Sequence, residues 1–223
     1  SYTANMEVPV TFVLQTGEHP KREELVEFLS AIAAVNDSLL LDERDCDSAL
    51  RSPASFYLEV NGQSTGISFS GIPSGHEFNS LVLAILRSSG TALKMDDGIQ
   101  AMLASIQERL HFEVFVSLSC HNCPDVVQAL DQFALLNDNI SAEMIDGGLY
   151  PELIEQRDIQ GVPCVYLNGE LFANGKVDTA KMLDKLQTLY PYLNETTAEA
   201  LPLQDVVIIG GGPAGISAAV YSC

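Results

Sequence analysis

Two stretches of the chain repeat one pattern of apolar and polar positions at an offset of 101 residues. Residues 13–37 (VLQTGEHPKREELVEFLSAIAAVND) and 114–138 (VFVSLSCHNCPDVVQALDQFALLND) each begin as a strand-like run. Each continues with apolar residues three or four positions apart, the spacing of one helix face. The apolar positions that align are Leu25, Val26, Leu29, Ile32, Ala33 and Val35 with Val126, Val127, Leu130, Phe133, Ala134 and Leu136. The pattern therefore predicts a strand followed by a helix in each copy.

The segments after the two helices also correspond. A short apolar strand is predicted over 39–41 in the first copy and over 140–145 in the second. Strand-like runs then lead to Asn61-Gly62 and Asn168-Gly169, and this dipeptide favours a tight hairpin turn. Each hairpin is followed by a predicted helix, over 76–88 and over 178–190. The order βαβ and then ββα, found twice, indicates two small α/β domains.

Two further segments complete the predicted domain organisation. A helix over 97–110 would join the two copies, because its apolar residues fall on one face: Ile99, Met102, Leu103, Ile106 and Leu110. The segment 191–204 is polar, without a clear period, and fits a linker. We therefore expect domains over 1–95 and 96–190, a linker over 191–204, and a further unit over 205–223.

The unit over 205–223 carries a glycine fingerprint. An apolar run predicts a strand over 205–209, and Gly210, Gly212 and Gly215 follow it in G-x-G-x-x-G spacing before a helix opens. Strand, glycine turn and helix together indicate the start of a dinucleotide-binding domain. The acidic residue expected about 20 positions further on is not in this sequence. We therefore expect a fragment of a longer flavoprotein or NAD(P)-dependent protein, and no dinucleotide bound by this chain alone.

Cys120 and Cys123 form a C-x-x-C motif where the second predicted strand gives way to its helix. Free N–H groups and the helix dipole at a helix start favour a thiolate. In this strand-to-helix setting the motif indicates thiol–disulfide exchange. In the first copy His19 and Arg22 stand at the equivalent positions, so we expect no exchange chemistry there.

The two thiols have other possible interpretations. They could form a structural disulfide or an inert buried pair. A zinc site needs four ligands, and His121 with the two thiols leaves one missing. A c-type haem needs a histidine directly after the second cysteine, where the chain has Pro124.

Composition narrows the classes of function. The net charge is −19 with only 11 Lys and Arg residues, which argues against binding a nucleic-acid backbone. No run of about 18 apolar residues indicates a membrane span, and no signal-peptide pattern opens the sequence. The chain has five cysteines, of which two are closely spaced, and this does not resemble a secreted disulfide framework. We expect a cytoplasmic protein.

Several longer motifs together are similar to one family. They are GHEF at 75–78 with SLVLA at 80–84, SLSCHNCPDVVQAL at 117–130, IDGG at 145–148, GVP at 161–163 and GGGPAG at 210–215. This combination resembles the N-terminal region of the alkyl hydroperoxide reductase flavoproteins over nearly the whole chain. The resemblance implies two tandem thioredoxin-like domains, followed by a truncated strand–helix start of an FAD-binding domain. It also implies a cytoplasmic homodimer when full length.

The same resemblance implies an electron relay. In such proteins NADH reduces FAD, the flavin reduces a second C-x-x-C in the C-terminal part, and that dithiol reduces the N-terminal one. The N-terminal dithiol then reduces the disulfide of a two-cysteine peroxiredoxin partner. FAD and NAD(H) would therefore belong to the full-length protein. Two alternatives remain: a free-standing tandem-thioredoxin protein disulfide oxidoreductase, and a docking module without turnover.

Roles follow for the residues at the predicted centre. Cys120 would attack the partner's disulfide, and Cys123 would resolve the mixed disulfide. Pro163 stands where thioredoxin-like folds place a cis-proline beside the dithiol, although an ordinary proline at a strand start is the alternative. His121 would stabilise the thiolate or simply face solvent.

Glu77 and the other cysteines have less specific roles. Glu77 has two interpretations. It is an acidic residue of the kind that commonly stands at a helix start, or it belongs to a loop, 75–77, that reaches the dithiol. There its carboxylate would shuttle a proton or modulate Cys120. Cys46, Cys164 and Cys223 are interpreted as packing residues rather than redox partners. Cys164 is the least settled, because it follows Pro163.

Overall fold

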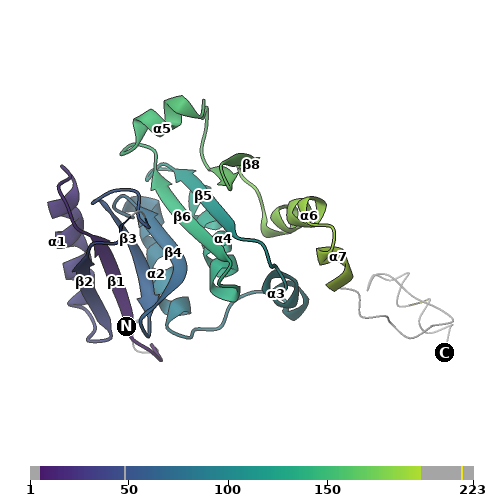
Figure 1. Ribbon diagram of the computed structural model, residues 1–223, viewed down its shortest axis with the longest axis horizontal. Coiled ribbons are helices and arrows are strands. Elements are labelled where there is room, and N and C mark those ends of the chain that lie inside the picture. Colours follow the sequence, from purple (N-terminus) through teal and green to yellow (C-terminus); the bar gives the residue numbers. More distant parts are fainter. Residues whose placement is uncertain (1–5, 48, 197–216, 218–223) are drawn as a thin grey trace.

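The computed structural model describes residues 6–47, 49–196 and 217 of the chain and contains one eight-stranded mixed sheet (Figure 1). The order of its strands is β2-β1-β3-β4-β6-β5-β7-β8. The strands are β1 (Val10–Gln15), β2 (Leu39–Arg44), β3 (Ser55–Val60), β4 (Gln63–Ser70), β5 (Leu110–Val116), β6 (Ile140–Asp146), β7 (Cys164–Leu167) and β8 (Glu170–Asn174). The helices are α1 (Arg22–Ala33), α2 (Phe78–Ser88), α3 (Asp97–Ala104), α4 (Cys123–Leu136), α5 (Pro151–Gln156), α6 (Thr179–Leu189) and α7 (Leu193–Thr196), with a 3₁₀ turn η2 (Gly75–Glu77) before α2. The fingerprint glycines Gly210, Gly212 and Gly215 lie outside the described residues.

The two copies fold with the same order of elements, except that the second has an additional helix, α5, between β6 and β7. In the first, β1 pairs in parallel with β2 and antiparallel with β3, which pairs antiparallel with β4. In the second, β5 pairs in the same way with β6 and β7, and β7 pairs with β8. The helices α1 and α4 begin 101 residues apart, at Arg22 and Cys123, which is the offset of the sequence repeat. The βαβ–ββα order predicted for both copies is confirmed.

Tight turns close both hairpins. Asn61 and Gly62 have φ of 52° and 78°, and Asn168 and Gly169 have φ of 50° and 86°. Positive φ at both central residues is what a type I′ hairpin turn requires, and Asn-Gly adopts it readily. The predicted hairpins are therefore confirmed.

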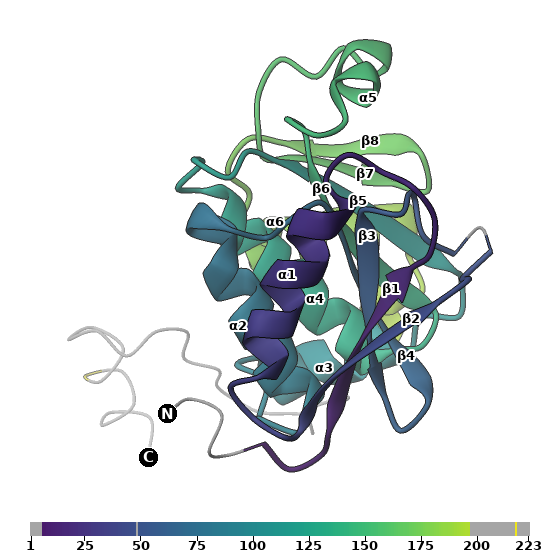
Figure 2. The ribbon, with the colours of Figure 1, turned by 90° about the vertical axis from the view of Figure 1, so that its left-hand side faces the viewer.

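The two copies share one sheet and one core. β4 pairs in parallel with β6, from Ile67 opposite Ala142 to Ser70 opposite Ile145. At Gly66 a Cβ would stand 2.6 Å from the backbone oxygen of Ile140, so a side chain there would prevent this approach. Figure 2 shows α1, α2 and α4 on the same face of the sheet, and buried side chains of both copies form one cluster beneath them. The domain boundary at 95/96 stays a prediction, but the halves are joined by strand pairing and not by a linker alone.

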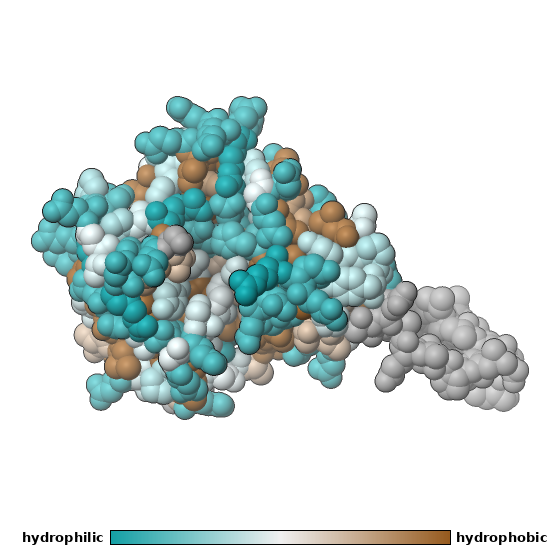
Figure 3. Space-filling view, viewed as in Figure 1, coloured by the Kyte–Doolittle hydropathy of each residue, from teal (hydrophilic) through white to brown (hydrophobic). Residues whose placement is uncertain are grey.

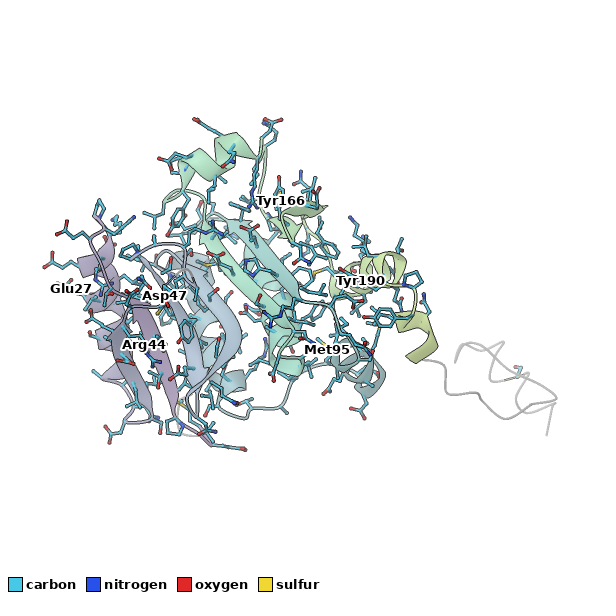
Figure 4. All side chains as sticks on the ribbon, viewed as in Figure 1. Glu27, Arg44, Asp47, Met95, Tyr166 and Tyr190 are labelled. Atoms are coloured by element: carbon cyan, nitrogen blue, oxygen red, sulfur yellow. A yellow bond between two sulfur atoms is a disulfide. The ribbon has the colours of Figure 1, made fainter. Side chains whose placement is uncertain are left out.

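The opposite, open face of the sheet carries a charged network between the copies. Hydrophilic residues predominate over the sheet in Figure 3, and Arg44, labelled in Figure 4, pairs with Glu59 at 3.1 Å. The network itself centres on Arg51 of the first copy, which contacts Glu143 at 2.7 Å and Glu113 at 2.8 Å. Arg157 also pairs with Glu113, at 2.7 Å. Glu113 and Glu143, the buried carboxylates of the second copy on this face, therefore each have an arginine partner.

Two expectations for helices are corrected. The joining helix predicted over 97–110 ends at Ala104, and Leu110 instead begins β5 opposite Ile140. The helix ends there because the Asn137 side-chain amide donates to the backbone oxygens of Leu103 and Ile106, at 2.9 and 2.8 Å. Sequence patterns also did not predict α5, and α7 falls inside the predicted linker. No helix among the described residues has the length and apolarity needed to cross a membrane.

Glu143 makes stability depend on pH. Burial alone would raise the pKa of Glu143, but hydrogen bonds from His111, Arg51 and Ser70 lower it to about 2 from the ordinary 4.5. Because the pKa of Glu143 is lowered in the folded chain, its carboxylate stabilises the fold at pH values above its unfolded-state pKa of 4.5. This stabilisation is lost as the pH falls through 4.5 towards 2. Between about pH 6 and pH 3 the loss amounts to roughly 2 kcal/mol.

Urea unfolding at these two pH values tests this contribution. Between about pH 6 and pH 3 we expect the free energy of unfolding of Glu143→Gln to fall by roughly 2 kcal/mol less than that of the wild type. Glu152→Gln, at an exposed position of α5, is the matched control and should follow the wild type. Equal pH dependence in the wild type and Glu143→Gln would contradict the assignment.

Candidate redox site

The two thiols lie in the turn between β5 and α4. Cys120 and Cys123 form a disulfide, with their Cα atoms 5.6 Å apart. Cys123 is the first residue of α4 and is fully buried, whereas Cys120 is partly exposed. The backbone N–H of Cys123 donates to the Cys120 sulfur at 3.2 Å. This N–H group and the helix dipole would stabilise negative charge on Cys120 after reduction.

Pro163 lies beside the dithiol. The Val162–Pro163 peptide bond is cis, as the resemblance implied. The backbone oxygen of Val162 is 3.8 Å from the Cys120 sulfur. β7 begins at the next residue, Cys164. The structure therefore brings Pro163 and the exposed thiol together.

The turn η2 of the first copy reaches the loop that carries the dithiol. The backbone N–H of His76 donates to the backbone oxygen of Leu118 at 3.1 Å. Gly75 has a φ of 56°, and a Cβ there would stand 2.5 Å from that same oxygen. The His76 ring lies against the ring of His121, with 4.1 Å between their centroids. The two copies therefore meet at the dithiol loop.

His121 lies on the rim of this site. Its side chain is exposed, and its Nδ1 is 3.3 Å from the backbone oxygen of Ser119. Its ring contact is with His76 of the first copy. The structure thus places His121 next to Cys120 in the chain and in contact with η2.

Glu77 ends η2 as a fully buried carboxyl group. Its Oε2 accepts a hydrogen bond from the Ser80 hydroxyl at 2.7 Å, and its Oε1 has no partner. Burial raises the pKa of Glu77 to about 7, against the opposing effect of Ser80. The turn η2 packs against α4, the helix that begins at Cys123, so Glu77 is an acid in contact with that helix that exchanges its proton around neutral pH.

The other described cysteines lie apart from the dithiol. Cys164 belongs to a small apolar cluster with Phe115, Ile145 and Tyr166, whereas Cys123 belongs to the main core. Because side chains alternate along a strand, Val165 faces that main core and Cys164 faces the open side of the sheet. Burial raises the pKa of the Cys164 thiol. The packing interpretation fits Cys164, while Cys46 is half-buried and Cys223 lies outside the described residues.

The equivalent position in the first copy is filled by an arginine. Arg22 begins α1, as Cys123 begins α4. Its guanidinium donates to the backbone oxygens of Gln15 and Pro53 and pairs with Glu43. A guanidinium that is satisfied in this way leaves no exchange chemistry at the first copy's helix start.

A group of possible metal ligands lies elsewhere. His111, Glu113 and Glu143 present ligand atoms within 4.8 Å of one another on the open face. Arg51 and Arg157 already pair with both carboxylates. Neither Cys120 nor Cys123 belongs to this group, so it is separate from the dithiol.

The sequence pattern did not single out Asp131, a buried polar residue on the helix that begins at Cys123. Asp131 is 2% exposed on α4, among the apolar positions of that helix. The sequence did contain one indication of this buried acid, because Asp131 directly follows the core residue Leu130. Its significance depends on α2, which packs against α4 and brings Glu77 towards it.

Glu77 also has a measurable effect on stability. Because the pKa of Glu77 is raised, its carboxyl group stabilises the folded chain at pH values below its unfolded-state pKa of 4.5. This stabilisation is lost as the pH rises from 4.5 through about 7. Between about pH 5 and pH 8 we expect the free energy of unfolding of the wild type to fall by roughly 2–3 kcal/mol because of Glu77. The Glu77→Gln variant should not show this fall. Urea unfolding of the oxidised chain measures it, with the exposed Glu155→Gln as control. A wild type and Glu77→Gln with the same pH dependence would show that Glu77 titrates normally.

Comparisons with known proteins identify the family of the chain. Residues 110–188 match the thioredoxin domain family. The chain is 43% identical over 222 residues to the alkyl hydroperoxide reductase AhpF of Staphylococcus aureus, covering 97% of this chain and 41% of that protein. It therefore spans about two fifths of the length of that relative.

Solved structures extend the comparison. The NTD_N/C domain of alkyl hydroperoxide reductase AhpF from Enterococcus faecalis is 32% identical, with a TM-score of 0.77 over 83% of this chain and 94% of that one. A protein disulfide oxidoreductase from Aeropyrum pernix is 23% identical, with a TM-score of 0.73 over 85% of this chain and 89% of that one, and shows the shared fold. From its sequence, fold and coverage, the chain belongs to the AhpF family of alkyl hydroperoxide reductases and corresponds to its N-terminal thioredoxin-like region.

Proposed function

We propose that the chain is the dithiol–disulfide relay of an NADH-dependent peroxiredoxin reductase. In this role it accepts two electrons from a flavin/disulfide centre in the C-terminal part of the full-length protein. It passes them to the disulfide of a two-cysteine peroxiredoxin. Membership of the AhpF family supports the proposal, although the relatives' full activity extends over a longer chain than this one.

The observation that carries the proposal is the unequal burial of the two thiols. Cys120 is partly exposed at the end of the turn, and Cys123 lies fully buried behind it. A protein disulfide can therefore approach the partly exposed Cys120, whereas Cys123 has no exposed surface. This asymmetry suits an attacking thiol and a resolving thiol.

The exchange conserves atoms and electrons in two steps. The Cys120 thiolate attacks one sulfur of the partner disulfide, a mixed disulfide forms, and the other partner sulfur leaves as a thiolate. Cys123 then loses its proton and attacks the Cys120 sulfur, so that the mixed disulfide breaks and the second partner sulfur leaves. Two electrons have passed to the partner, and Cys120 and Cys123 are again joined as observed.

The neighbouring residues have supporting roles in this scheme. Pro163 has no backbone N–H and shapes the groove next to Cys120. Glu77 serves as the acid or base that handles the Cys123 proton, since its pKa of about 7 suits exchange near neutral pH. His121, exposed next to Cys120, stabilises the thiolate when it carries a proton.

The cofactors belong to the full-length protein. FAD and NADH would supply the electrons, and Gly210, Gly212 and Gly215 would start the FAD site. These glycines lie outside the described residues, so no step above passes through the flavin. The proposal includes a cytoplasmic homodimer for the full-length protein.

Two other functions make different predictions. A free-standing protein disulfide oxidoreductase would need no flavin partner, and its resemblance here, at 23% identity, concerns the fold. A docking module would hold Cys120 and Cys123 as a permanent disulfide. Trapping and potential measurements separate these functions from the relay.

Cysteine variants test the assigned order of attack. We expect pre-reduced Cys123→Ser to accumulate a mixed disulfide with an oxidised two-cysteine peroxiredoxin, because its resolving thiol is missing. Cys120→Ser should give none through the motif, since its other thiol, Cys123, is fully buried. Non-reducing electrophoresis and peptide mass spectrometry measure the adduct, and Cys164→Ser is the matched control that should turn over as the wild type does. An adduct on Cys120→Ser, or none on either variant while the wild type transfers no electrons, would contradict the scheme.

The reduction potential separates a reductase from an oxidant or a structural disulfide. Equilibration with a dithiol redox buffer should give a potential near the roughly −270 mV of thioredoxin. Cys164→Ser should leave the value unchanged, because Cys164 lies in a separate cluster. A potential near the roughly −120 mV of strongly oxidising periplasmic proteins would exclude the reductase.

A further inference from the structure

A strip of buried polar side chains runs between α2 and α4, where the copies pack on the helical face. We call it the polar strip, and it consists of the buried Glu77, Ser80 and Asp131 with the half-buried Arg87 and Gln128. Ser80 donates to Glu77 at 2.7 Å, and the Gln128 amide donates to the Ser80 hydroxyl at 3.4 Å. Arg87 donates to the backbone oxygen of Gln128 at 3.2 Å. The strip therefore links Glu77 on the first copy with α4 on the second.

Asp131 stands one helical turn beyond Gln128 on α4. It is 2% exposed, and its Oδ2 has no hydrogen-bond partner. Oε1 of Glu77 and Oγ of Ser88 are likewise buried and unpartnered, and both belong to the η2–α2 segment. A buried polar atom without a partner costs about 1–3 kcal/mol, and proteins usually satisfy such atoms with internal water. Polar atoms in need of water are therefore present on both sides of the α2–α4 contact.

The two carboxyl groups differ in how they hold protons. Burial raises the pKa of Asp131 well above its ordinary value, the charge of Glu77 raises it further, and Arg87 opposes this. The pKa of Glu77 is raised to about 7. Asp131 therefore holds its proton to a higher pH than an ordinary aspartate does, while Glu77 gains and loses one around neutral pH. Glu77 from η2 and Arg87 from α2 are the charged groups that act on Asp131 across this contact.

The proposed exchange creates a demand for proton movement inside the protein. Cys123 is fully buried and must lose a proton when it attacks the mixed disulfide. At that moment the partner is bonded to Cys120 and stands over the exposed side of the site. Glu77 is itself fully buried, so a proton that it accepts needs an internal route. Arg87 is half-buried at the far end of α2, which gives the strip an end near solvent.

We propose that Asp131 is a positioning residue that acts through Glu77 by relaying its proton along the polar strip towards the Arg87 end. This inference rests on the proposed exchange. The Cys123 thiol gives its proton to the Glu77 carboxylate, and its sulfur forms the bond to Cys120 as the partner sulfur leaves. Glu77 then passes a proton through internal water to Asp131, which gives up its own proton in the direction of Arg87 and solvent. Glu77 returns to the carboxylate, and no electrons move in the relay.

A small aromatic disulfide, dithiobis(nitrobenzoate), separates the two steps. Attack by Cys120 releases one coloured thiolate, and resolution by Cys123 releases the second. In the full, pre-reduced chain near pH 7 we expect Asp131→Asn to slow the second release at least about tenfold, within the range that acid–base groups contribute. The first release should be unchanged, because it needs no proton from Cys123. Stopped-flow absorbance measures both.

Controls distinguish a proton role from a structural one. Asp125→Asn, at an exposed carboxylate on the first turn of the same helix, should leave both releases unchanged. Asp131→Glu restores a carboxyl group and should recover most of the rate of the second release. If Asp131→Asn lowers the thermal midpoint, Asp131→Leu, of similar volume and without exchangeable protons, provides the same comparison.

The outcomes separate this inference from the proposed function. A second release that is equally fast in the wild type and in Asp131→Asn would overturn the relay. So would equal slowing of both releases, which indicates a structural effect. If the wild type resolves the aromatic disulfide but transfers no electrons to an oxidised peroxiredoxin, the proposed partner is wrong and the relay is still supported by a slow second release in Asp131→Asn.

Discussion

The pairing of β4 with β6 is the constraint on which the rest of the architecture depends. It runs in parallel from Ile67–Ala142 to Ser70–Ile145 and converts two small units into one sheet of eight strands. Because the strands are joined in this register, the helix after β4 and the helix before β6 also meet, and α2 packs against α4. The turn η2 is thereby placed against the loop that carries Cys120. A copy without a dithiol thus becomes part of the environment of the dithiol.

Besides the shared apolar core, polar contacts join the copies on both sides of this pairing. On the open face, Arg51 of the first copy satisfies Glu113 and Glu143 of the second. On the helical face, Glu77 is tied through Ser80 to Gln128. The former is a fully paired charged network, whereas the latter retains unpartnered carboxyl oxygens. A paired network stabilises a join, while titratable groups with spare hydrogen-bonding capacity suit proton transfer.

Local patterns predicted the elements well, and the sequence was silent where distant segments meet. Apolar spacing predicted α1 and α4, Asn-Gly predicted the hairpins, and C-x-x-C indicated the two thiols. The cis-proline Pro163 was implied by the family resemblance. The end of α3 was missed because Asn137, more than thirty residues away in the sequence, caps it. The importance of Asp131 was missed because its buried position results from contact between two helices. Pairing across copies leaves no periodic signal in either copy.

The central claim is that electrons pass from this one dithiol to a peroxiredoxin disulfide. The most direct measurement mixes the pre-reduced chain with an oxidised two-cysteine peroxiredoxin, quenches with an alkylating agent and assigns every cysteine by mass spectrometry. The account predicts a Cys120–Cys123 disulfide in the chain, free Cys46 and Cys164, and two alkylated thiols on each peroxiredoxin disulfide that is lost. Recovery of alkylated Cys120 and Cys123 beside an intact peroxiredoxin disulfide would contradict it.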